Sequence, residues 1–194
     1  MAGRPRRYKE QELIDKSIPV FWEKGYNGAT AKDLMEALDI GQGSFYNIFK
    51  GGKKELYQKS LKRFWAITKK EIDEGVKTIG DPIDFIRTLY YSKLERSTQD
   101  IMNGCYFGNA VVEFRNVDKE TRDLTSELML FLEKELKQLI IEAQRLGKYD
   151  KEKSASVTAK YLLNLFNGFN ITQRINPDVE NLKKMLDENL KIFD

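Results

Sequence analysis

The sequence contains no histidine and a single cysteine, Cys105. Without histidine the chain lacks the commonest metal ligand and the usual base that activates a serine or cysteine nucleophile, which argues against an enzyme and against a metal or cofactor site. One cysteine excludes an intramolecular disulfide and favours a cytoplasmic protein. No apolar run approaches the roughly 18 residues that cross a bilayer, and no apolar stretch follows the basic N-terminus to make a signal peptide. We therefore expect a cytoplasmic protein that is not an enzyme and has no membrane partner.

Charged and apolar residues, by contrast, are plentiful. Hydrophobic residues make up 41% and charged residues 32% of the 194 positions, as in folded globular proteins. The net charge is only +3, but residues 1–65 contain 13 Lys and Arg against 8 Asp and Glu, whereas residues 66–194 contain 20 against 22. A basic first third is expected where only that part meets DNA phosphate, although an ordinary solvated surface explains the same imbalance.

The spacing of apolar residues is helical almost throughout. Short breaks separate about nine segments, which predicts an all-α fold. We expect a three-helix N-terminal domain in residues 1–55 and a C-terminal helical bundle in residues 56–194. Inside the first helix, Pro19 predicts a kink, and Gly25 predicts a left-handed end.

Residues 30–49 predict two short helices joined by a tight turn. Thr30 suits an N-cap with Asp33 in the capping-box position, and Asp39 tolerates a left-handed turn. Apolar side chains close a small core and leave a polar edge on the second helix, formed by Gln42, Gly43, Ser44, Tyr46 and Asn47. Such an edge suits base contacts in the DNA major groove, although a purely structural helical hairpin shows the same pattern.

This region resembles the N-terminal domain of the TetR family of transcriptional regulators. The matching residues are Phe21-Trp22-Glu23-Lys24-Gly25-Tyr26, Ala29-Thr30, Asp33-Leu34, Ile40, Gly43-Ser44-Phe45-Tyr46, Phe49 and Lys-Glu-Leu-Tyr at 54–57. The resemblance implies a homodimeric repressor of double-stranded operator DNA that a small-molecule effector releases. It also implies that the polar edge faces the bases, with Thr30 and the first lysine of the fourth helix on phosphate. The link after Phe49 is one residue longer than the common pattern, so Lys53 and Lys54 both stay candidates.

The N-terminal arm is a second candidate DNA contact. Gly3-Arg4-Pro5 resembles the core of an AT-hook, and Arg6 and Arg7 follow it. Arginines on such an arm enter a narrow minor groove beside the major groove that the helix occupies. A merely solvated basic tail is the alternative.

Residues 103–114 resemble the Gly-Cys-x-x-x-Asn-x-x-x-Glu stretch that opens the sixth helix in one branch of the family. The resemblance implies that this helix borders the ligand pocket and abuts the DNA-binding domain. The candidate ligand-binding residues are Cys105, Tyr106, Phe107, Asn109, Phe131 and Phe166, and ordinary core packing is the alternative for each. Cys105 is either a redox or electrophile sensor or an inert core thiol.

The last two helices carry the expected dimer interface, as the resemblance implies. Its candidate residues are Leu162, Phe166, Phe169, Leu182, Met185 and Leu186. A ligand-independent architectural DNA-binding protein remains the competing function, with little sequence preference and a steep salt dependence. The sequence gives neither the effector nor the operator.

Overall fold

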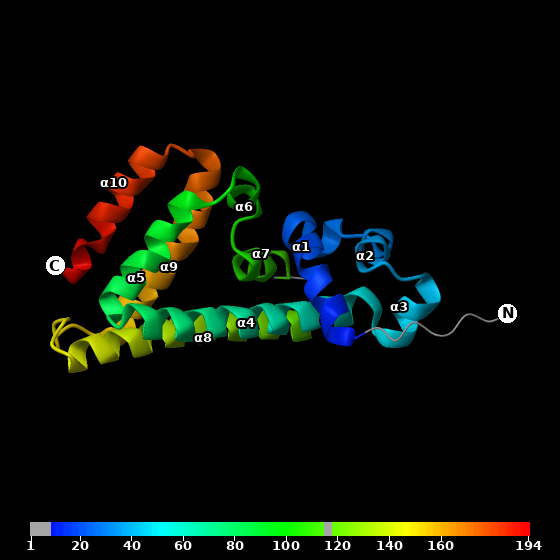
Figure 1. The fold of residues 1–194 in the computed structure, drawn as a ribbon, viewed down its shortest axis with the longest axis horizontal. Coiled ribbons are helices and arrows are strands. Elements are labelled where there is room, and N and C mark those ends of the chain that lie inside the picture. Colours follow the sequence, from blue (N-terminus) through cyan, green and yellow to red (C-terminus); the bar gives the residue numbers. More distant parts are fainter. Residues whose placement is uncertain (1–8, 115–117) are drawn as a thin grey trace. The chain divides into compact units, whose positions relative to one another are not determined.

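The computed structural model describes residues 9–114 and 118–194 (Figure 1). These residues form α-helices and short 3-10 helices and contain no strand, which confirms the all-α prediction. The elements are α1 (Glu10–Gly28), α2 (Ala31–Leu38), α3 (Gln42–Ile48), α4 (Gly52–Ile79), α5 (Pro82–Tyr91), η1 (Ser92–Glu95), α6 (Thr98–Asn103), α7 (Tyr106–Glu113), α8 (Lys119–Arg145), α9 (Ala155–Ile175), α10 (Val179–Leu190) and η2 (Lys191–Phe193). One more α-helix than the expected nine is present in the described residues, because η1 and the extended residues Arg96 and Ser97 separate α5 from α6.

The chain divides into two compact units. The first contains the residues up to Thr68 together with Asn109–Thr125, and the second contains Lys69–Gly108 and Ser126–Asp194. Helices α4, α7 and α8 therefore contribute residues to both units. The first unit thus includes a stretch that lies in the middle of the sequence.

The core of the first unit follows from the apolar spacing of its helices. Leu13, Phe21, Leu34, Phe45 and Leu56, from α1 to α4, are each no more than 3% exposed. Each buried side chain of this size contributes about 1.5–3 kcal/mol relative to full exposure. The core fixes the positions of α2 and α3 against α1.

Helix α1 continues through Pro19, and the only non-helical backbone torsions within it are at Gly25, with φ +69° and ψ 173°. The prediction of a left-handed glycine is confirmed. At Pro19 the backbone keeps helical torsions.

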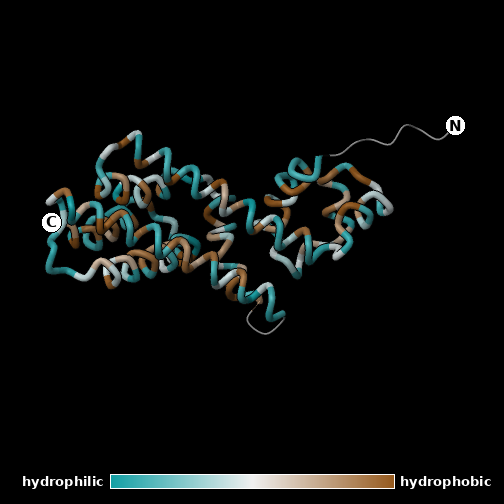
Figure 2. Tube along the Cα trace, turned by 90° about the horizontal axis from the view of Figure 1, so that it is seen from below, coloured by the Kyte–Doolittle hydropathy of each residue, from teal (hydrophilic) through white to brown (hydrophobic). Residues whose placement is uncertain are grey.

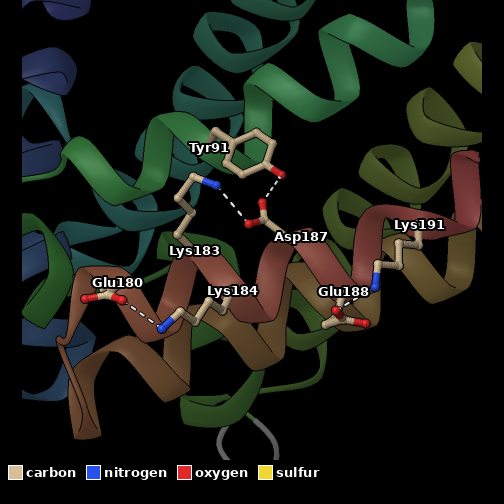
Figure 3. A network of polar contacts seen from close by, with 7 residues as sticks. All are labelled: Tyr91, Glu180, Lys183, Lys184, Asp187, Glu188 and Lys191. Atoms are coloured by element: carbon tan, nitrogen blue, oxygen red, sulfur yellow. Dashed lines mark hydrogen bonds and ion pairs between the residues drawn. The ribbon is translucent and has the colours of Figure 1, made fainter.

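In the second unit, α5 and α10 pack together and their contact has a polar edge (Figure 3). The Tyr91 hydroxyl donates to the Asp187 carboxylate at 2.6 Å, and Lys183 pairs with the other oxygen of Asp187 at 2.8 Å. Beneath this edge, the buried Tyr90 hydroxyl donates to the Leu162 carbonyl of α9. Hydrophobic and hydrophilic residues alternate along the helical turns of the chain, as amphipathic helices require (Figure 2).

Among residues 9–114 and 118–194, no helix is long and apolar enough to cross a membrane. The same residues contain no group of three or more Cys, Asp or Glu side chains placed to hold a metal ion.

Candidate nucleic-acid interface

A complete capping box starts α2. The Thr30 hydroxyl accepts from the Asp33 N–H at 3.1 Å, and the Thr30 N–H donates to the Asp33 carboxylate at 2.8 Å. Lys24 also pairs with this carboxylate at 2.7 Å. Hydrogen bonds from Lys24 and then Thr30 hold the pKa of Asp33 well below its usual range. Thr30 is exposed, as a phosphate contact requires, but its hydroxyl already takes part in the capping box.

The turn after α2 has the geometry that the sequence predicted. Asp39 is left-handed with φ 53°, and Gly41 is the N-cap of α3. Phe45 and Phe49 are completely buried and anchor α3. The opposite edge is open to solvent: Gln42, Gly43, Tyr46 and Asn47 are exposed, and Ser44 is half-buried. The structure thus brings all five predicted base-facing residues onto one short helix.

A shallow depression of about 590 Å³ lies where α2, the turn and α3 meet. Its lining residues are Lys32, Met35, Glu36, Asp39, Ile40, Gly41 and Gln42. Nothing lies within 4 Å of where a Cβ on Gly41 or Gly43 would be. Packing within the described protein therefore does not require either glycine, and the start of α3 is open to a large partner.

The two candidate phosphate lysines have different partners. The Lys53 ammonium donates to the Tyr26 and Ala29 carbonyls at 2.9 and 3.0 Å, and it lies 4.4 Å from the centre of the Tyr26 ring. Lys53 thus closes the junction between α1 and α2.

Lys54 instead forms ion pairs with Asp118 at 2.9 Å and Glu120 at 3.0 Å. Hydrogen bonds from the Thr121 hydroxyl and from Lys54 lower the pKa of Asp118 to about 2. The Lys54 ammonium is therefore paired with carboxylates inside the first unit.

The sequence did not single out two other lysines of this region. Lys32 on α2 and Lys50 after α3 are exposed, and within the described residues neither forms an ion pair. Only the three-dimensional pairing of charges distinguishes these two lysines from Lys53 and Lys54.

The stretch Asn109–Thr125 docks on α1 and α4 within the first unit. The Glu113 carboxylate accepts the N–H groups of Tyr26 at 2.8 Å and Asn27 at 2.6 Å, directly after the left-handed Gly25. The Phe114 ring stacks on Tyr57, with ring centres 5.2 Å apart. We call Glu113, Phe114, Asp118, Glu120 and Thr121 the clasp. The resemblance implies a contact between helix α7 and the DNA-binding domain, but the sequence did not indicate which residues form it.

The candidate ligand-binding residues differ in burial and in the partners of their side chains. Tyr106 and Phe107 are buried, whereas Phe131 is 36% exposed. Asn109 begins the second stretch of the first unit. Cys105 accepts the Gly108 N–H through its sulfur at 3.3 Å, and burial raises the pKa of its thiol. Phe166 has the Lys93 ammonium 3.9 Å from its ring centre.

The candidate dimer residues mostly face the chain's own core. Leu162, Phe169, Leu182 and Leu186 are at most 5% exposed within the single chain, and Phe166 and Met185 are half-buried. The side chains that α9 presents to solvent are others: Val157, Ile171 and Ile175 are 66%, 58% and 80% exposed. Arg4, Arg6 and Arg7 lie outside the described residues.

Two family models match this chain. The model for bacterial regulatory proteins of the tetR family matches residues 13–59, and the model for the tetracyclin repressor-like C-terminal domain matches residues 83–188, more than half of the chain. The HTH-type transcriptional repressor DhaR of Mycobacterium sp. (strain GP1) is 27% identical over 191 residues, which cover 96% of this chain and 91% of that protein.

Solved structures agree with this fold. The reduced form of NemR from E. coli superposes with a TM-score of 0.84 at 19% identity, covering 96% of this chain and 98% of that one. A cysteine mutant of the regulator CifR, in a structure with 26-base-pair operator DNA, superposes with a TM-score of 0.82 at 19% identity, covering 98% of this chain and 100% of that one.

Proposed function

The chain belongs to the tetR family of bacterial regulatory proteins, and from this premise we propose that it is a homodimeric repressor that binds operator DNA through α3 and is released by a small-molecule effector. Residues 1–55 read the DNA and residues 56–194 hold the effector and the dimer contact. The protein works in the cytoplasm, where bacterial operators lie.

The exposed edge of α3 is the observation that carries this proposal. Gln42 and Asn47 are exposed amides, and such amides form paired hydrogen bonds with adenine in the major groove. Tyr46, 47% exposed, adds a large surface for a thymine methyl group or the sugar–phosphate backbone. Two copies related by a two-fold axis place their α3 helices roughly 34–36 Å apart, one turn of DNA.

We assign the phosphate contacts to basic side chains near α2 and α3 that form no ion pair among the described residues, because these charges are available to DNA. Lys32 and Lys50 flank the helix pair, and we assign them to phosphate together with Thr30. Arg4, Arg6 and Arg7 of the arm are assigned to the adjacent minor groove. Lys53 supports the α1–α2 junction, and Lys54 reaches phosphate only when it leaves Asp118 and Glu120.

The clasp supports release by an effector. Because α7 and α8 each run from the second unit into the first, a ligand that shifts either helix moves groups that hold α1 and α4. Coupling of this kind is typically worth about 1–3 kcal/mol and acts in both directions.

Selection of random duplex DNA by the purified dimer tests the function. We expect an enriched palindrome, bound at least about tenfold more weakly by Gln42→Ala or Tyr46→Ala, because one good base contact is worth roughly 1–3 kcal/mol. Gln138→Ala, an exposed glutamine of α8, is the matched control and should bind as the unmodified protein does.

Two outcomes would contradict the proposal. Weak, sequence-blind binding with a steep salt slope supports the architectural alternative instead. Normal operator binding by both α3 variants refutes the assignment of this edge. The sensor alternative at Cys105 is disfavoured, since a reactive cysteine needs a lowered pKa and burial raises the pKa of this thiol.

A further inference from the structure

A group of cationic and amide side chains lies within the second unit, where η1, the α6–α7 junction and α9 meet. Arg96 donates to the Asn170 side-chain oxygen of α9 at 3.3 Å and to the Gly104 carbonyl at 3.4 Å. Arg174, also on α9, donates to the Ile101 carbonyl of α6 at 3.3 Å. Lys93 of η1 has its ammonium 3.9 Å from the centre of the Phe166 ring.

Lys93 has no acidic partner among the residues that the structure describes. Within the described part of the chain no carboxylate pairs with its ammonium, and the charged group that acts on it most is Arg96, which repels it. Burial is the main reason that the pKa of Lys93 falls to about 8. Asp100, the acid that acts on Arg96, is exposed and receives a hydrogen bond from the Ser97 hydroxyl. A lysine that is removed from water without a carboxylate is unfavourable unless an anion joins it.

Two buried amide oxygens of α9 add a second, independent observation. The side-chain oxygens of Asn167 and Gln173 have no hydrogen-bond partner among the described residues, and each is almost completely hidden from solvent. A Cβ built on Gly108 would lie 3.8 Å from the Asn167 oxygen and 3.5 Å from the Cys105 sulfur, so this oxygen points toward the start of α7. Buried acceptors are normally satisfied, and unsatisfied ones in a native structure mark a missing donor.

We propose that Lys93, Arg96, Asn167 and Gln173 form the recognition part of the effector site, and that the effector is a small organic acid that also carries a hydrogen-bond donor. The carboxylate would pair with Lys93 and Arg96, and a hydroxyl or N–H group of the ligand would donate to an amide oxygen of α9. The Phe166 ring provides an apolar wall. This assignment rests on the proposed function, because it names the class of molecule that releases the repressor.

The test measures binding to the full-length dimer without DNA, by calorimetry and thermal shift. The probes are 4-hydroxybenzoate, its neutral amide 4-hydroxybenzamide, and benzoate, which keeps the acid and lacks the donor. We expect 4-hydroxybenzoate to bind at least about tenfold more tightly than the amide, since a hydrogen bond between charged groups is roughly twice as strong as a neutral one.

Variants separate the two parts of the site. Lys93→Met should lose the preference for the acid over the amide, while Lys160→Met, an exposed lysine on α9, should keep it. The double variant Asn167→Leu, Gln173→Leu should bind benzoate and 4-hydroxybenzoate equally. Because Lys93→Met removes an unpaired charge from a half-buried position, it should fold at least as stably as the unmodified chain, so loss of binding cannot be ascribed to unfolding.

Equal binding of the acid and the amide, or an unchanged preference in Lys93→Met, overturns the assignment. Operator release is measured separately on the selected palindrome. An acid that binds with the expected preference but leaves the operator bound supports the anion site and contradicts ligand release in the proposed function.

Discussion

At the scale of single residues, Gly25 and Glu113 show how one backbone torsion creates a binding site for a carboxylate. The left-handed φ of Gly25 turns the next two N–H groups the same way, and Glu113 accepts both. Successive N–H groups that converge in this way make an anion-binding nest. An Ala Cβ at this position would also lie 3.2 Å from the Glu113 carboxylate oxygens.

Gly25→Ala should lower the free energy of unfolding by about 1–2 kcal/mol, the cost of a left-handed conformation for an L residue. Gly28→Ala is the matched control: Gly28 lies in the helical turn that follows, and its new Cβ would make only an ordinary contact at 3.7 Å. There alanine should be neutral or slightly stabilising. Urea unfolding of both variants at one protein concentration checks this, and equal effects would contradict the backbone explanation.

The lowered pKa of Lys93 predicts that the stability of the protein depends on pH. Its pKa is lowered from 10.5 to about 8 in the folded chain, so between these values the unfolded state holds a proton that the folded state has released. Stability contributed by this group therefore rises as pH increases from about 8 to 10.5. Thermal unfolding at pH 7.5 and pH 10 should show a smaller pH response in Lys93→Met than in Lys160→Met. Identical responses would mean that Lys93 is not desolvated.

At the scale of helices, the clasp links α7 and the start of α8 to α1 and α4. Two kinds of contact form the clasp. The Glu113 carboxylate accepts two backbone N–H groups of α1, and Lys54 forms ion pairs with Asp118 and Glu120. The low pKa of Asp118, about 2, keeps this carboxylate charged throughout the neutral and mildly acidic range. Any change that frees Lys54 must therefore come from a movement of the helices.

Glu113→Gln keeps the shape of the side chain but removes its charge. Its carboxylate accepts two N–H groups, and a hydrogen bond to a charged group contributes about 1.5–3 kcal/mol. We expect a loss of about 1–2 kcal/mol in unfolding free energy, because the amide oxygen still accepts one N–H. Glu127→Gln, an exposed glutamate of α8, should change stability by less than about 0.5 kcal/mol. If Glu113→Gln left the free energy of unfolding unchanged, the clasp would not hold the helices together.

Local sequence signals predicted the α2–α3 helix pair well. Contacts between residues far apart in the sequence could not be predicted from such signals. The capping box of Thr30, the left-handed Asp39 and the exposed edge of α3 all depend on neighbours in sequence, and the structure has each of them. The docking of Glu113 depends on a partner 87 positions away, which no periodicity encodes.

For the same reason, the sequence does not distinguish the core residues of α9 from its exposed apolar residues. Leu162 and Ile171 are both apolar at helical spacing, yet the first is fully buried and the second is 58% exposed. Apolar spacing shows that a helix has an apolar face but not which partner covers it. Four of the six expected dimer residues, Leu162, Phe169, Leu182 and Leu186, are buried within the single chain.

At the scale of the whole molecule, repression requires two copies. One short helix such as α3 provides few base contacts, and a palindrome is bound tightly only when two half-sites are engaged by one rigid pair. We propose that a second copy covers the exposed apolar side chains of α9, since burial of such groups drives association.

Ile171→Glu places a charge in the middle of this exposed face and should dissociate the dimer, because an unpaired carboxylate cannot be buried against an apolar partner. Ile141→Glu is the matched control, since Ile141 is 41% exposed on α8, a helix not assigned to the interface. Light scattering after gel filtration should give a monomer for the first variant and a dimer for the second.

Operator affinity should then fall at least about tenfold in Ile171→Glu alone, as each monomer holds a single half-site. A dimeric Ile171→Glu would place the contact elsewhere. A monomer that still binds the full palindrome tightly would show that the two half-sites are read independently.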